Sequence, residues 1–254
     1  MKKVLVIAGL DPTGGAGILL DVAIFKKNNL FPYAAVSALT VQNSLGVKEY
    51  INTDKIFLQN EIDVLMDEGS VSALKIGMIG SIDNTKEIVK AINKYGFEII
   101  VLDAIIKASD NTYLNEEKSI EYIKKELFPL CTVVTFNRFE AEIYSNMKLK
   151  DEEDIFEAII ELRRYCKETV IKGGHFEGEN VLDFYDTGRE VIKKSKKRLK
   201  KRVRGTGCAF SSTLLCKIIQ LKDREKAFIE TKKEVLEMIQ KAKKIGRGSS
   251  QIII

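Results

Sequence analysis

Histidine is nearly absent from this sequence of 254 residues, since His175 is the only one. A zinc site built on histidines, or a Ser-His-Asp triad, is therefore poorly supplied. The four cysteines form no Cys-x-x-Cys motif, and no pair of them has metal-ligand spacing. There are only 3 prolines, and no tract has the composition of a disordered linker. These shortages argue against zinc enzymes and triad hydrolases.

Long hydrophobic runs are also missing, because no stretch approaches the length of a membrane span. The chain opens with a strand-like segment, Lys3–Ala8, and lacks the longer apolar run and cleavage site of a signal peptide. Hydrophobic residues make up 45% and charged residues 30%, which is ordinary for a protein with a sizeable core. We expect a cytoplasmic protein with free thiols that does not act at a membrane.

Positive charge is concentrated in one place. The net charge is +5, and residues 193–204 hold nine Lys or Arg side chains and no acid. Nucleic-acid binding is one interpretation of such a run. A solvated hairpin beside a phosphate site is the other, and we favour it because the run contains no aromatic platform for bases. We therefore expect no nucleic-acid partner.

Strand-like and helix-like segments alternate along the whole chain. This alternation predicts βαβ units that form one mainly parallel sheet with helices on both faces, in a single domain over residues 1–254. We expect strands over 4–8, 34–41, 73–80, 99–103, 131–135 and 169–174, a hairpin over 181–192, and helices over 18–28, 54–67, 83–95, 119–127, 151–167, 209–221 and 223–244.

The segment Arg204–Ser212 is typical of a tight loop that leads into a buried helix. Two glycines flank Thr206, and Cys208 begins a run of small and apolar residues. The first amides of a helix lack partners within it, and the helix dipole makes that end positive. Such a loop can hold a phosphate in transfer, and its field would favour a thiolate at Cys208. The alternative is a helix start with a buried, inert cysteine.

Several polar side chains end predicted strands or begin predicted helices. Asp103 and Lys172 each end a strand, and Asn137 and Glu140 lie three residues apart at a helix start. Ligands of parallel sheets gather beyond the carboxyl ends of the strands. The acids suit a hydrated magnesium ion, and the lysine suits a polyphosphate. The alternatives are a helix cap for Asp103 and a capping box between Asn137 and Glu140.

A second glycine-rich loop, Gly9–Gly17, follows the first predicted strand. It is neither a P-loop nor a dinucleotide fingerprint. It is either a strand-to-helix turn or a backbone segment that closes over a small ligand, with Asp11 and Asp21 as polar contacts. Gln42, at the end of the next strand, can read an amino-substituted nitrogen heterocycle through its paired donor and acceptor, or cap a turn.

Taken together, these motifs resemble the hydroxymethylpyrimidine/phosphomethylpyrimidine kinases of thiamin synthesis, within the ribokinase-like superfamily. Each motif is weak alone, but seven of them occur in order at matching separations over nearly the whole chain. The motifs are Ala8–Gly17, Ala38–Asn43, Lys75–Met78, Val101–Asp103, Asn137–Glu142, Val170–His175 and Gly205–Cys208.

The resemblance implies a ribokinase-like fold, a homodimer, and Mg²⁺-dependent transfer of the ATP γ-phosphoryl group. The acceptors would be 4-amino-5-hydroxymethyl-2-methylpyrimidine and then its monophosphate. By position, Gln42 would read the pyrimidine, and Asp21 would lie near the hydroxymethyl group. Gly9, Val41, Met78 and Ile105 would surround the ring.

The resemblance also assigns the phosphate side of the site. Asp103 and Glu140 would serve magnesium, and Lys172 would meet the phosphates of ATP. The anion hole would consist of Gly205, Thr206, Gly207 and Cys208. Cys208 stands where most ribokinase-like enzymes have an aspartate base. It could act as a thiolate base or as a donor to the transferring phosphoryl group, and the sequence leaves both open.

Two rivals remain. A pyridoxal or pyridoxine kinase shares the ATP half and the cysteine motif, but its branch does not keep the Gln42-Asn43 pair. A non-catalytic pyrimidine-binding homologue would not need the acids, the lysine and the cysteine together.

The chain departs from the family pattern in the loops around ATP and substrate: at Ala104 and Phe136, where proline is usual, at Val203-Arg204, where Thr-His is usual, and in the tail 245–250, which lacks the usual histidines and proline.

Overall fold

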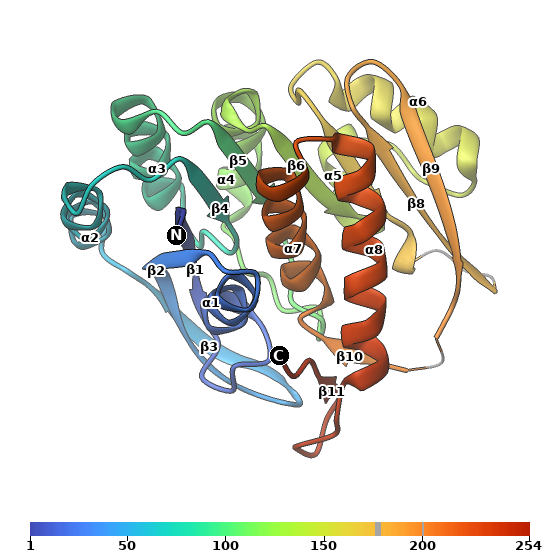
Figure 1. Ribbon diagram of the computed structural model, residues 1–254, viewed down its shortest axis with the longest axis horizontal. Helices are drawn as coiled ribbons and strands as arrows, with labels where there is room; N and C mark the ends of the chain where they lie inside the picture. Colours follow the sequence, from blue (N-terminus) through green and yellow to red (C-terminus); the bar gives the residue numbers. More distant parts are fainter. Residues whose placement is uncertain (176–178, 200) are drawn as a thin grey trace.

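The computed structural model describes residues 1–175, 179–199 and 201–254, which form one large sheet with helices on both faces (Figure 1). Nine strands in these ranges have the order β3-β2-β1-β4-β5-β6-β7-β8-β9. They are β1 (Lys3–Leu10), β2 (Phe31–Asn43), β3 (Gly46–Asn52), β4 (Ala73–Ile76), β5 (Ile99–Asp103), β6 (Val133–Asn137), β7 (Thr169–Lys172), β8 (Asn180–Asp186) and β9 (Val191–Lys197). The helices are α1 (Gly17–Lys27), α2 (Lys55–Asp67), α3 (Ile82–Tyr95), α4 (Glu117–Tyr122), α5 (Arg138–Ser145), α6 (Glu152–Leu162), α7 (Thr206–Leu221) and α8 (Arg224–Lys241).

The six central strands, from β2 across to β7, pair in parallel. The outer strands β3, β8 and β9 pair antiparallel. The prediction of a mainly parallel sheet covered on both faces is therefore confirmed. Because parallel strands end at the same edge, the residues that follow β1, β4, β5, β6 and β7 are brought together there.

Each face of the sheet has its own hydrophobic core. In β1, Leu5 and Ile7 pack in the core that contains residues of α2, α3, α5 and α6. Val4 and Val6, which alternate with them, pack in the opposite core with residues of α1, α7 and α8. Both sets are fully buried. This two-sided burial explains why the strand is continuously apolar instead of alternating with polar residues.

Helix starts follow ordinary capping chemistry. The side chains of Asp54, Ser81, Asp151 and Asp223 accept hydrogen bonds from backbone amides in the first turns of α2, α3, α6 and α8. Gly96 ends α3 with a φ of 65°, as the sequence predicted. These local signals fix where the helices begin, and the apolar faces fix how they pack.

Some elements differ from the prediction. Strand β3, an antiparallel partner of β2, was not expected, because its residues are mostly exposed and carry no apolar alternation. Strand β4 ends at Ile76 instead of residue 80. The helix expected over 119–127 is α4 followed by a π-helical turn, Ile123–Leu127. The helix expected over 151–167 ends at Leu162, and the strand expected over 131–135 lies at 133–137.

The basic run is divided between two strands. Its first part lies in β9, where Lys193 and Lys194 pair with Glu152 and Glu225 at the surface. Its last part is β10 (Val203–Arg204), which pairs with β11 (Ser250–Gln251) of the tail. Lys200 lies outside the described residues. Within the described ranges, no helix has the length and apolar character needed to cross a membrane.

Candidate active site

The loop before α7 adopts a conformation that only glycine accommodates readily. Gly205 is the N-cap, with a φ of 77°. A Cβ added there would lie 2.1 Å from the carbonyl oxygen of Gly15, in the other glycine loop. The two glycine loops therefore touch through their backbones. This close contact brings the start of α7 against the loop that follows β1.

A cavity of about 890 Å³ opens along this edge of the sheet. Most of the predicted site residues line it, although they come from segments far apart in the sequence. The lining includes Gly9, Gln42, Met78, Asp103, Ile105, Glu140, Lys172, Gly205, Thr206, Gly207 and Cys208. Two predicted residues lie elsewhere: Val41 is 54% exposed on the outer part of the sheet, and Asp21 is fully buried behind the cavity wall.

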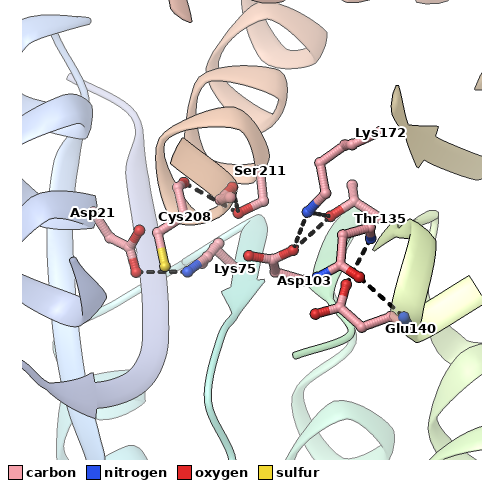
Figure 2. Close-up of polar contacts among 10 residues, drawn as sticks. Asp21, Lys75, Asp103, Thr135, Glu140, Lys172, Cys208 and Ser211 are labelled. Carbon is pink, nitrogen blue, oxygen red and sulfur yellow. Dashed lines mark hydrogen bonds and ion pairs between the residues drawn. The ribbon is translucent and has the colours of Figure 1, made fainter. Parts of the chain in front are cut away.

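Asp103 and Lys172, which both line the cavity, form an ion pair (Figure 2). Lys172 Nζ donates to Asp103 Oδ1 at 2.7 Å, and Thr135 Oγ1 donates to the same oxygen at 2.9 Å. Burial alone would raise the pKa of Asp103, but Lys172, together with Lys75, lowers it below its ordinary value. Asp103 is therefore an ionised carboxylate whose other oxygen, Oδ2, can face a ligand.

Glu140 combines a structural role with a place in the cavity. Its Oε2 accepts a hydrogen bond from the amide of Asn137 at 2.7 Å, and Asn137 Oδ1 accepts one from the amide of Glu140 at 3.0 Å. The capping box that the sequence allowed is thus present. Burial raises the pKa of Glu140 to about 8, and the negative charge of Asp103 adds to the rise, while Lys172 opposes it.

The donor set fits a magnesium ion. Asp103 and Glu140 are two buried carboxyl groups that line the same cavity. A divalent cation bound between them would relieve the electrostatic repulsion of their ionised forms. In the described part of the chain, no group of three or more His, Cys, Asp or Glu side chains could hold a metal. Magnesium suits a site with few protein ligands because it commonly keeps several waters and binds through one or two carboxylates plus substrate phosphates.

Cys208 lies in the first turn of α7 and is 9% exposed. Burial raises the pKa of its thiol to about 11, while Lys75 opposes the rise and Asp21 and Asp103 add to it. The expectation that the helix start would favour a thiolate is therefore wrong, because burial and two nearby carboxylates outweigh the cation. The group that faces the cavity at neutral pH is a thiol.

Thiolate absorbance provides a direct check on Cys208. The other cysteines, Cys131, Cys166 and Cys216, are also buried, and burial raises the pKa of each thiol well above its ordinary value. We expect no thiolate absorbance from the folded protein between pH 7 and 9. The first rise should occur above about pH 10 and should be lost in Cys208→Ser. A titration near pH 7 that depends on Cys208 would contradict this account.

Asp21 belongs to a buried ion pair that the sequence did not reveal. Its Oδ2 accepts from Lys75 Nζ at 2.6 Å, and its Oδ1 accepts from Ser212 Oγ at 2.7 Å. Both charged side chains are fully buried. Figure 2 shows the pair beside Cys208, with Asp21 on the side away from Lys172 and Lys75 between Asp21 and Asp103. One sequence feature could have indicated this pair: Lys75 lies inside the otherwise apolar four-residue strand β4, where a lysine needs a buried partner.

A second group of lining residues suits a flat, polar ring. Gly9, Met78 and Ile105 provide an apolar wall, and a Cβ added at Gly9 would lie 2.8 Å from Met78 Sδ. Within the described part of the chain, the side-chain amide of Gln42 makes no hydrogen bond, so its donor and acceptor can both serve a ligand. The lining also includes apolar residues of α7 and α8 and two cationic side chains: Phe210, Val235, Leu236, Ile239, Arg138 and Arg198.

Comparison with known proteins finds similar sequences and similar structures. A family model described as phosphomethylpyrimidine kinase matches residues 11–252. A hydroxymethylpyrimidine/phosphomethylpyrimidine kinase of Aquifex aeolicus is 30% identical over 246 residues, which are 96% of each chain. The crystal structure of a phosphomethylpyrimidine kinase from Clostridium difficile has a TM-score of 0.81 at 27% identity, covering 93% of this chain and 99% of that one. Pyridoxal kinase from Staphylococcus aureus in complex with ADP has a TM-score of 0.91 at 24% identity, covering 100% and 93%, and this likeness shows a shared fold.

Proposed function

Because the chain belongs to the phosphomethylpyrimidine kinase family, we propose that it transfers the γ-phosphoryl group of ATP to a hydroxymethylpyrimidine and then to the resulting monophosphate. The observation that carries this proposal is one shared cavity. Its wall holds an ionised Asp103 paired with Lys172, the buried Glu140, and the anion loop Gly205–Cys208. The free amide of Gln42 lines the same cavity and suits the aminopyrimidine.

Phosphoryl transfer depends chiefly on positioning and on neutralising charge. We assign the phosphates of ATP to Lys172 and to the amides at the start of α7. Magnesium, held by Asp103 and Glu140, would neutralise charge on the phosphate oxygens. Cys208 keeps its proton at Sγ, so it acts as a hydrogen-bond donor toward the phosphoryl group instead of as a thiolate base. The apolar residues of α7 and α8 are assigned to the adenine.

The experiment that tests this function is ADP release. The purified protein should release ADP when ATP, Mg²⁺ and 4-amino-5-hydroxymethyl-2-methylpyrimidine are all present, and release should stop when EDTA is added. Cys208→Ala should lower the rate by roughly 10²-fold, as expected for a group that donates in the transition state. ADP release that is independent of the pyrimidine, or a wild-type rate in Cys208→Ala, would count against the proposal.

We further propose that residues 1–254 form a single kinase domain that works as a cytoplasmic homodimer. The continuous sheet supports one domain. The four cysteines are free thiols, which suits a reducing compartment. Exposed apolar side chains on β2 and β3 and in the turn between them offer a surface for a second copy: Leu39, Val41, Leu45 and Ile51. Sedimentation equilibrium should give twice the chain mass, and a monomer at micromolar concentration would contradict this.

A further inference from the structure

Arg204 is a buried cation in a run of basic residues whose other described members are exposed or half-buried. It is 6% exposed and immediately precedes the anion loop. Its Nη2 lies 3.2 Å from Asp11 Oδ2, and its Nη1 donates to the carbonyl oxygen of Asn43. Arg204 also lines the active-site cavity. A single guanidinium therefore joins the anion loop, the Gly9–Gly17 loop and the end of β2 beside Gln42.

Asp11 is held firmly in the wall of the same cavity. It is 2% exposed, and its Oδ1 accepts hydrogen bonds from the amide and the hydroxyl of Thr13 at 2.9 and 2.8 Å. With Oδ1 used in this way, Oδ2 has Arg204 as its cationic partner. Without Arg204, the cavity wall would carry an uncompensated negative charge next to the phosphoryl-transfer loop.

The backbone of Arg204 is also fixed. Strand β10 pairs Arg204 with Gln251 in the tail, and Gln251 Nε2 donates to Thr13 Oγ1 at 3.4 Å. The tail therefore ties the arginine and its aspartate partner into one unit. Because both ends of the ion pair are anchored, the guanidinium is in place before any ligand arrives.

We propose that Arg204 is a specificity-determining residue that neutralises Asp11, so that the cavity accepts an acceptor already carrying a phosphate monoester. This inference rests on the proposed function and concerns its second step. The hydroxymethyl acceptor is uncharged near this wall, so an acid there matters little to it. The monophosphate is a dianion that must approach both the phosphates of ATP and Asp11, and like charges at close range disfavour binding strongly.

The second transfer is balanced without a proton acceptor. An oxygen of the acceptor's phosphate dianion attacks the γ-phosphorus of ATP and forms a new P–O–P bond. The bond from the γ-phosphorus to the β–γ bridging oxygen breaks, and ADP leaves with that electron pair. The total charge is the same on both sides, so the requirement at this step is electrostatic, which is the property that Arg204 supplies.

The test compares the two acceptors in kcat/KM. In Arg204→Gln, we expect kcat/KM for the monophosphate to fall at least about 10-fold more than kcat/KM for the hydroxymethyl compound, in line with the loss of one buried charge partner. Adding Asp11→Asn to Arg204→Gln should restore the ratio between the two acceptors, because the uncompensated acid is gone. Arg189→Gln, which removes an equal charge from an exposed position in the turn between β8 and β9, should leave the ratio unchanged.

The outcomes are distinguishable. An equal fall for both acceptors, or no recovery of the ratio in the double variant, would assign Arg204 a purely structural role and overturn the inference. If Arg204→Gln does not fold, two other variants test the inference. Arg204→Lys should keep the wild-type ratio of kcat/KM between the two acceptors, and Asp11→Asn should shift that ratio toward the monophosphate. A changed ratio in Arg204→Lys, or a shift toward the hydroxymethyl compound in Asp11→Asn, would overturn the inference. A wild-type protein that uses the hydroxymethyl compound alone also overturns it, whereas a protein that uses neither acceptor refutes the proposed function.

Discussion

Asp103→Asn is expected to lower kcat/KM for ATP by about 10³-fold, the upper range for removing one electrostatic stabiliser from an active site. The substitution keeps the shape of the side chain but removes the charge that Lys172 contacts at 2.7 Å. It also removes one of the two carboxylates assigned to magnesium. Steady-state kinetics at several Mg²⁺ concentrations would show the loss, which added Mg²⁺ should relieve only in part.

A matched control is available in Asp186. It is also a buried aspartate with a cationic partner, because Arg163 contacts both of its oxygens at 2.8 Å. It lies in β8 and is not part of the cavity lining. Asp186→Asn should lower stability but leave kcat/KM close to the wild-type value. A loss below tenfold in Asp103→Asn, or equal losses in both variants, would contradict the role given to Asp103.

Lys75→Met is expected to have the largest effect on stability, lowering the free energy of unfolding by about 3–5 kcal/mol, the usual cost of breaking a buried ion pair. The fully buried carboxylate of Asp21 would lose the cation that contacts it at 2.6 Å. Adding Asp21→Asn should recover most of the loss, because Asn can still accept from Ser212 without carrying a charge. Urea unfolding followed by circular dichroism would measure all three proteins.

The control for Lys75 is an exposed pair. Lys94 contacts Asp63 at 3.1 Å on the surface, with 57% of the lysine side chain exposed. Lys94→Met should leave the free energy of unfolding nearly unchanged, because exposed ion pairs contribute little. If Lys75→Met were as stable as Lys94→Met, or if Asp21→Asn made Lys75→Met worse, the pair would not be the buried charge pair described above.

The central part of the site could be predicted from sequence because its residues are tied to local signals. Asp103 and Lys172 each end an apolar strand, and the anion loop is marked by glycines before a helix. The rule that parallel strands end at one edge then places them together. The capping box of Asn137 and Glu140 was also visible as a spacing, and the structure shows that capping does not prevent Glu140 from lining the cavity.

The missed parts depend on pairings between residues distant in the sequence. Asp21 and Lys75 are 54 residues apart, and Arg204 and Asp11 are 193 residues apart. Nothing in the local pattern distinguishes Arg204 from the exposed cations around it. The thiolate prediction for Cys208 failed for a related reason, because a helix start was visible in the sequence but the depth of burial was not.

The most direct test of the whole account is a competition between acceptors. Equal amounts of 4-amino-5-hydroxymethyl-2-methylpyrimidine and pyridoxal are mixed with ATP, Mg²⁺ and the protein, and the phosphorylated products are quantified by mass spectrometry. The product ratio gives the ratio of kcat/KM values directly. The account predicts that the pyrimidine phosphates predominate and that Gln42→Leu erodes the preference. Predominant pyridoxal phosphate, unaffected by Gln42→Leu, would contradict it.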